Sequence, residues 1–208
     1  MRAEAVHVKK IALVSVFSAL GVVIAPFSWF EFLGTKAYPG QHMVNALLGV
    51  LAGPLWAAIA AFIIGGIRIG LGVGTIYAFP GGIPGGLVVG AVYWALKRFR
   101  AGERIRLFSA FSEPIGTIFI GVTLSLYLVA PLVASNVGIA PWAGTKIPLE
   151  LIAEKGSLLA FSIFAAGWAL SSIAGCTLGF IALSILNRAG VNRGTLFGEK
   201  SRQGSAER

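Results

Sequence analysis

Residues 34–49 read GTKAYPGQHMVNALLG and lead into an apolar segment that continues to Ile67. Between residues 37 and 67 there is no charged side chain, yet the start of the segment carries Gln41, His42 and Asn45, preceded by Lys36. His42 and Asn45 share one face of a helix, because they are three residues apart. Polar side chains in a membrane need partners, so these residues bond either neighbouring helices or a ligand.

The composition of the chain predicts an all-α integral membrane protein. Of the 208 residues, 56% are hydrophobic and 12% are charged, whereas soluble domains carry about 25% charged residues. The net charge of +9 does not indicate nucleic-acid binding, because the basic residues lie at the ends of apolar runs. One cysteine, Cys176, and two histidines predict no disulfide within one chain and no metal site.

Breaks in the apolar runs predict six membrane spans. Gly53-Pro54 and the glycine-rich stretches 70–74 and 79–86 interrupt runs that are too long for one crossing. The expected spans cover residues 11–28, 41–53, 55–71, 83–97, 110–133 and 157–187. We therefore expect a six-helix membrane domain over residues 1–187. The polar residues 188–208 predict a disordered cytoplasmic tail.

The basic residues set the expected topology. Six spans with the N-terminus inside place 13 basic residues on the inner side and 4 on the outer side. If residues 41–71 formed a single span, the best of the five-span arrangements would have 11 basic residues inside and 6 outside. The positive-inside rule therefore favours six spans with both termini cytoplasmic. The segments 29–40, 72–82 and 134–156 then lie outside.

Two charged residues belong to the expected spans. Arg68 lies near the outer face, where it can donate to a ligand or hold loop carbonyls. Glu113 precedes Pro114 near the inner face, where we expect it to start a helix, pair with Arg106 or contact a cytoplasmic partner. His42 and Glu113 are the acid/base candidates of a membrane enzyme, but this topology places them towards opposite faces.

Nucleotide and hydrolase motifs are absent from the sequence. It has no GxxxxGK[ST] loop, HExxH, GxSxG or paired carboxylates. We therefore expect no enzyme activity, no cofactor and no ATP hydrolysis by this chain. Two tryptophans remain ambiguous: Trp142 suits a membrane-interface anchor or a ligand contact, and Trp168 suits core packing or an aromatic wall. Small residues at helical spacing in the first span predict close approach of another helix: Ala12, Ser15 and Ala19.

Three stretches resemble a known family: TKAYPGQHMVNALLGVLAGPLWAA (35–58), IGGIRIGLGVGTIYAFPGGIPGGLVVG (64–90) and SEPIGTIFIG (112–121). They are similar to the ThiW family, the predicted thiazole-specific substrate-binding (S) components of energy-coupling factor transporters. The resemblance extends over about residues 8–187, and the blocks PGQHxxN and RxxxGxGTxxAFPG are its specific parts.

The resemblance implies a six-helix S-component in the plasma membrane, with a pocket near the outer face. A transmembrane coupling protein and two cytoplasmic ATPases would drive uptake, and the small residues of the first span would contact the coupling protein. Segment 36–40 would form a lid, and the implied ligand is the hydroxyethylthiazole part of thiamine. The residues expected to contact it are Lys36, Tyr38, Gln41, His42, Asn45, Arg68, Tyr77, Phe79 and Trp142.

Two points stay open at this stage. Arg68 has no evident role with a neutral thiazole, and it would suit a phosphorylated ligand or brace the loop. The alternative function is a stand-alone secondary transporter, which normally needs an acidic residue at the bilayer midplane. Glu113 is the one candidate for that role, and the expected spans place it near an end.

Overall fold

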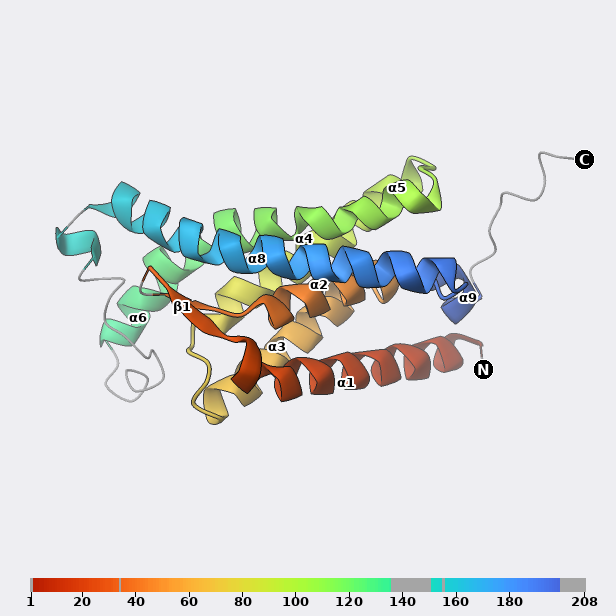
Figure 1. The fold of residues 1–208 in the computed structure, drawn as a ribbon, viewed down its shortest axis with the longest axis horizontal. Coiled ribbons are helices and arrows are strands. Elements are labelled where there is room, and N and C mark those ends of the chain that lie inside the picture. Colours follow the sequence, from red (N-terminus) through yellow and green to blue (C-terminus); the bar gives the residue numbers. More distant parts are fainter. Residues whose placement is uncertain (1, 34, 136–150, 155, 199–208) are drawn as a thin grey trace, which may run out of the picture.

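The structure is a computed structural model that describes residues 2–33, 35–135, 151–154 and 156–198. Within these residues, six helical segments run along one long axis (Figure 1). They are α1 (Arg2–Ser28), α2 (Pro39–Leu51), α3 (Pro54–Gly70), α4 (Ala78–Arg98), the continuous helix of residues 103–135, and α8 (Ser157–Arg188). The expected order of six helical segments is therefore present.

Four of these helices are long and apolar enough to cross a membrane: residues 4–28, 78–98, 103–135 and 157–188. Their outward faces carry large apolar side chains, such as Phe27 with 88% of its surface exposed and Leu158 with 80%. A soluble monomer rarely exposes apolar faces of this extent. The structure thus agrees with an all-α membrane protein whose outer surface faces lipid.

Helix α2 is the central element of the bundle. It has 13 residues, and all but Pro39 and Met43 are buried, because α2 packs against α1, α3, α4 and α8. It ends where Gly53 adopts a φ of 105°, a value that L side chains rarely reach, and Pro54 then begins α3. The polar residues of α2 therefore face protein rather than lipid.

The helix of residues 103–135 changes its winding where Glu113 lies. It comprises α5 (Glu103–Leu107), a 3₁₀ segment η1 (Phe108–Ser112), two π-helical segments η2 (Ile115–Val122) and η3 (Ser125–Val129), and α6 (Ala130–Ser135). Pro114 has no N–H and cannot continue the regular hydrogen-bond ladder. Wide π turns occur frequently at functional sites, and here they follow a fully buried carboxylate.

Both ends of the described chain meet at the same end of the bundle (Figure 1). Lys9 Nζ donates to the carbonyl of Leu196 at 2.9 Å, and Lys10 Nζ lies 5.4 Å from the centre of the Phe197 ring. The basic C-terminal ends of α4 and α8 lie at this end as well. This arrangement is the one that an even number of crossings produces.

The segment expected to be a disordered tail includes a short helix in the part that the structure describes. Helix α9 (Arg193–Phe197) begins with a capping box in which Asn192 and Thr195 bond each other's backbone N–H. Arg193 and Phe197 are buried, which ties α9 to the bundle. Residues 199–208 lie outside the described part.

A β-hairpin lies toward the other end of the bundle. Strand β1 (Phe30–Phe32) pairs antiparallel with β2 (Thr35–Ala37), and Glu31 is the cross-strand partner of Lys36. The sequence indicated a loop and a lid here, without predicting strands. Because β2 runs directly into Tyr38 and α2, the hairpin fixes the position of the first turn of α2.

Candidate substrate-binding site

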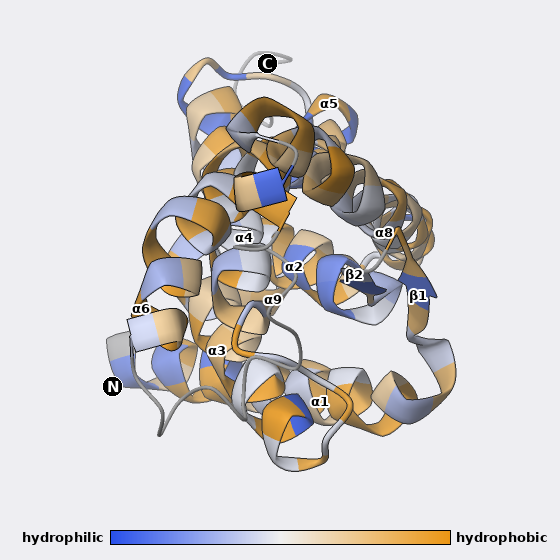
Figure 2. Cartoon of the chain, turned by 90° about the vertical axis from the view of Figure 1, so that its left-hand side faces the viewer, coloured by the Kyte–Doolittle hydropathy of each residue, from blue (hydrophilic) through white to orange (hydrophobic). Residues whose placement is uncertain are grey.

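A pocket lies at the end of the bundle that carries the hairpin. Its empty space is about 770 Å³ when the open solvent at its mouth is included. Viewed onto this end, the hydrophilic residues of β2 and of the start of α2 lie between α1, α4 and α8 (Figure 2). The pocket is lined by Glu31, Thr35, Lys36, Tyr38, Gln41, His42, Arg68, Thr75, Tyr77, Ala78, Gly81, Gly82, Phe164, Trp168 and Ser171.

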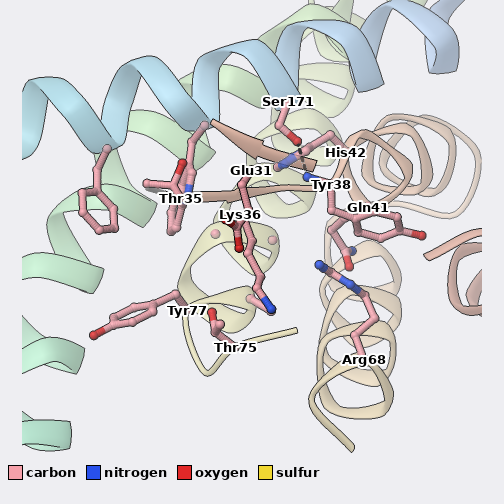
Figure 3. A pocket seen from close by; sticks show the side chains of 15 residues that line it. Glu31, Thr35, Lys36, Tyr38, Gln41, His42, Arg68, Thr75, Tyr77 and Ser171 are labelled. Atoms are coloured by element: carbon pink, nitrogen blue, oxygen red, sulfur yellow. Dashed lines mark hydrogen bonds between the residues drawn. The ribbon is translucent and has the colours of Figure 1, made fainter. Parts of the chain in front are cut away.

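The structure brings most of the expected ligand contacts together around this pocket (Figure 3). Six of the nine residues expected from the sequence line it: Lys36, Tyr38, Gln41, His42, Arg68 and Tyr77. Asn45 lies behind the wall, fully buried. Phe79 is absent from the lining and instead stacks on Phe62, with ring centres 5.2 Å apart. Trp142 lies outside the described residues, so its part in ligand contact stays a prediction.

Glu113 lies directly behind the pocket, which corrects its expected place near the inner face. His42 Nδ1 is 2.8 Å from Glu113 Oε1. Asn45 Nδ2 donates to the same oxygen at 2.9 Å, and Thr117 Oγ1 lies 2.8 Å from it. Ser172 Oγ donates to the other carboxylate oxygen. The expected pairing with Arg106 is also wrong, because Arg106 Nη2 pairs with Glu103 Oε2 at 2.7 Å.

These bonds determine which atoms of α2 remain available to a ligand. Asn45 Nδ2 donates both to Glu113 and to the Gly82 carbonyl, at 2.8 Å for the latter, so its Oδ1 must be an acceptor. Gln41 Nε2 donates to that Oδ1 at 3.2 Å. Gln41 Oε1 is consequently left buried without a partner. The amide network therefore leaves one unused acceptor on a residue that lines the pocket.

His42 connects the carboxylate to the pocket. Its Nδ1 is engaged by Glu113, while the residue itself lines the pocket, so Nε2 is the ring nitrogen left for a ligand. A fully buried carboxylate needs a compensating charge. Among the described residues, His42 is the one basic side chain that forms an ion pair with Glu113. His42 is therefore the polar link between Glu113 and the pocket.

Tyr38 connects the pocket to two helices. Its backbone N–H donates to Ser171 Oγ at 2.7 Å, and its hydroxyl donates to the Gly21 carbonyl of α1. The Arg68 guanidinium lies over its ring, 3.9 Å from the ring centre. Burial raises the pKa of Tyr38 to about 12, although the nearby Arg68 acts in the opposite direction. The phenol is therefore neutral and donates at physiological pH.

Helix α8 contributes one wall of the pocket, and of its residues only Trp168 was a candidate from the sequence. Phe164, Trp168 and Ser171 line the pocket from one face of α8, at spacings of four and three residues. Phe164 and Trp168 meet edge to face, with ring centres 6.3 Å apart. Core packing is the commoner role for a tryptophan such as Trp168, and here its ring both packs in the core and lines the pocket. Its spacing to Phe164 and Ser171 was the available signal.

Tyr38→Phe is expected to loosen the attachment of α1 to the pocket. The variant loses one buried hydrogen bond to Gly21, which contributes about 1 kcal/mol to stability. Thermal unfolding of the detergent-solubilised protein measures the loss. Tyr127→Phe is the control, because Tyr127 is 53% exposed on the outer surface. Equal melting temperatures for the two variants would argue against the tether.

Comparison with known proteins gives one match. The family model described as thiamine-precursor transporter protein (ThiW) matches residues 11–189. Searches of curated proteins and of solved structures returned no match. The matched region contains every residue that lines the pocket, together with Glu113 and its hydrogen-bond donors. The sequence placed His42 and Glu113 towards opposite membrane faces, which spoke against an acid/base pair of an enzyme. In the structure the two side chains are in contact, but the matched family is one of transporters. The chain belongs to the ThiW family of thiamine-precursor transporter proteins.

Proposed function

We propose that this chain is the membrane-embedded substrate-binding subunit of an energy-coupling factor importer. In this role it captures the hydroxyethylthiazole part of thiamine, or a related thiamine precursor, at the outer face of the plasma membrane. The observation that supports this most is the position of the pocket: it lies under the hairpin, at the end of the bundle opposite the basic helix ends.

The chemistry of the pocket suits a small flat heterocycle with a hydroxyl arm. Trp168 and Phe164 offer aromatic surface for the ring. His42, through the ring nitrogen that Glu113 does not engage, and Gln41, through its amide, would supply the polar contacts to the ring and the hydroxyl, because both residues line the pocket. Both polar groups are set by the same buried carboxylate, so the site is organised before a ligand arrives.

The topology proposed from the charge count also fits this role. We assign the end with α9 and the first turn of α1 to the cytoplasm, because the basic ends of α4 and α8 gather there. The hairpin end then faces outward, which is the side from which an import substrate arrives. All six lengthwise segments cross the bilayer in this proposal, with the short α2 enclosed by its neighbours.

The side of α1 that faces away from the bundle is available for the proposed coupling protein. Ala12, Ser15 and Ala19 are all exposed on this helix, which agrees with their expected role in partner contact. Small exposed residues let another helix approach closely. The coupling protein would bind on this side, with its two ATPases in the cytoplasm.

Uptake measurements test the subunit role. Cells that express this chain together with a coupling protein and its ATPases are expected to accumulate labelled hydroxyethylthiazole or its phosphate ester. Cells that express the chain alone, or with an ATPase inactivated at its nucleotide site, are expected to accumulate neither. ATP-independent accumulation by the chain alone would contradict the subunit role.

A second candidate function is a stand-alone proton-coupled transporter. It is favoured by one observation, the fully buried Glu113 that pairs with His42 inside the bundle, because such carboxylates serve as coupling sites in secondary transporters. This candidate requires uptake without coupling subunits, loss of uptake on collapse of the proton gradient, and loss in Glu113→Gln.

A further inference from the structure

Arg68 is a buried cation whose Nε has no hydrogen-bond partner among the described residues. It is 5% exposed and lines the pocket. Within the part of the chain that the structure describes, no carboxylate lies within 4.0 Å of its guanidinium. A buried charge that lacks an opposite charge is costly. The described side chains therefore leave the charge of Arg68 without an opposite charge in contact.

The contact with the Tyr38 ring does not satisfy the charge of Arg68. The guanidinium lies over the Tyr38 ring, with the carbon centre 3.9 Å from the ring centre. Such a contact offsets part of the cost of burial. However, a guanidinium stacked through its face keeps its N–H donors in its own plane. In Figure 3 the side chain of Arg68 reaches from α3 toward Gln41, across the pocket lining.

The other charges of the pocket leave it with a positive excess. Lys36 also lines the pocket, with its amine 4.9 Å from the centre of the Trp29 ring. Among the described lining residues the single carboxylate is Glu31, on the exposed strand opposite Lys36. The second carboxylate nearby, Glu113, is already paired with His42 behind the wall. Neither carboxylate neutralises Arg68.

We propose that the pocket takes an anionic thiamine precursor, in which an oxyanion on the ligand completes the site at Arg68. The oxyanion is a phosphate ester on the hydroxyethyl arm or a carboxylate on the thiazole ring. A guanidinium binds either group through two parallel N–H donors. Lys36 supplies a second, more exposed positive charge. This inference rests on the proposed function, because it uses the same pocket.

Direct binding to the full chain in lipid nanodiscs tests the inference. The ligands are hydroxyethylthiazole, its phosphate ester, a thiazole carboxylate and inorganic phosphate, each measured by equilibrium dialysis. Wild type is expected to bind at least one anionic thiazole about tenfold or more tightly than the alcohol. Arg68→Gln is expected to weaken that anion about tenfold to a hundredfold and to change alcohol binding less than about threefold. The two anionic ligands identify the chemical source of the charge.

Arg193→Gln provides a matched control. Arg193 is similarly buried and lies over Tyr93, but at the opposite end of the bundle, so its loss is expected to leave the preference for anions unchanged. Equal binding of all thiazoles by wild type, or an equal loss of all of them in Arg68→Gln, would overturn the inference and leave Arg68 as a brace for Tyr38.

The measurement with inorganic phosphate separates failure of this inference from failure of the proposed function. If wild type binds no thiazole at all, the proposed function fails. Saturable phosphate binding that Arg68→Gln removes would still support an anion site at Arg68. If wild type binds neither phosphate nor any thiazole, both proposals are overturned.

Discussion

Glu113→Gln is expected to lower ligand affinity by at least about a hundredfold and to destabilise the folded protein by about 3 kcal/mol. Four side chains direct hydrogen-bonding groups at this carboxylate, and one of them is His42. An amide has the same shape but a single acceptor oxygen and no charge, so part of the network meets an N–H₂ group instead. His42 also loses the carboxylate partner that orients its ring.

Equilibrium binding and thermal unfolding, measured on the same preparation, test this expectation. Glu103→Gln is the matched control, because Glu103 lies ten residues earlier on the same helix and forms a partly exposed ion pair with Arg106. Exposed pairs of this kind contribute little, so binding is expected to remain unchanged. If Glu113→Gln binds ligand as wild type does, the carboxylate does not organise the site.

Gly116→Ala is expected to destabilise the protein by about 2 kcal/mol or more and to abolish binding. A Cβ at this position would overlap the Pro84 carbonyl and would lie 2.8 Å from the Cα of Gly85. These are backbone atoms of α4 and cannot move aside as the end of a flexible side chain can. The added methyl therefore separates η2 from α4 and carries Glu113, one turn away, out of its cluster of donors.

The control is a glycine on a helix where a methyl group meets nothing. A Cβ at Gly66 of α3 would have no neighbouring atom within 4 Å, so Gly66→Ala is expected to leave binding intact and to raise helix stability by up to about 1 kcal/mol. Similar melting temperatures and affinities for the two alanine variants would contradict the close packing of η2 on α4.

The helical order was predictable from the sequence because its breaks are strong local signals. Gly53-Pro54 fixes the end of α2 in sequence and in structure alike. The start of α4 was placed too late, at residue 83 rather than Ala78, because Pro80 and Pro84 indicated a break. Proline is tolerated in the first turn of a helix, and Pro84 lies inside the same helix, where neighbouring helices can satisfy the backbone group that proline leaves unpaired.

The position of Glu113 along the bundle could not be predicted, because its depth in the membrane was counted from residue 110, the expected start of the span. The helix begins at Glu103 rather than at residue 110, so Glu113 lies ten residues, or about 15 Å, along it. Helix α2 is short, and His42 follows its first residue by only three positions. Two residues assigned to opposite faces therefore meet inside the bundle. Only tertiary packing shows this.

The candidate site was predictable where polar residues interrupt an apolar run. Gln41, His42 and Arg68 stood out for this reason, and all three line the pocket. Phe164 did not stand out and the role of Trp168 stayed ambiguous, because aromatic residues in an apolar helix are usually core or lipid-facing residues. Phe79 has the same character and packs on Phe62 instead. Aromatic contacts depend on helix rotation, which the sequence does not specify.

Blocking the pocket tests most directly whether it is the binding site for a thiamine precursor. Ala78 lines the pocket at the start of α4, whereas Ala91 is exposed on the same helix. Binding of the labelled hydroxyethylthiazole, or of its phosphate ester, is measured for wild type, Ala78→Trp and Ala91→Trp. The account predicts saturable binding at one site per chain in wild type and Ala91→Trp, and none in Ala78→Trp. Undiminished binding in Ala78→Trp, or no binding of either ligand by wild type, would contradict it.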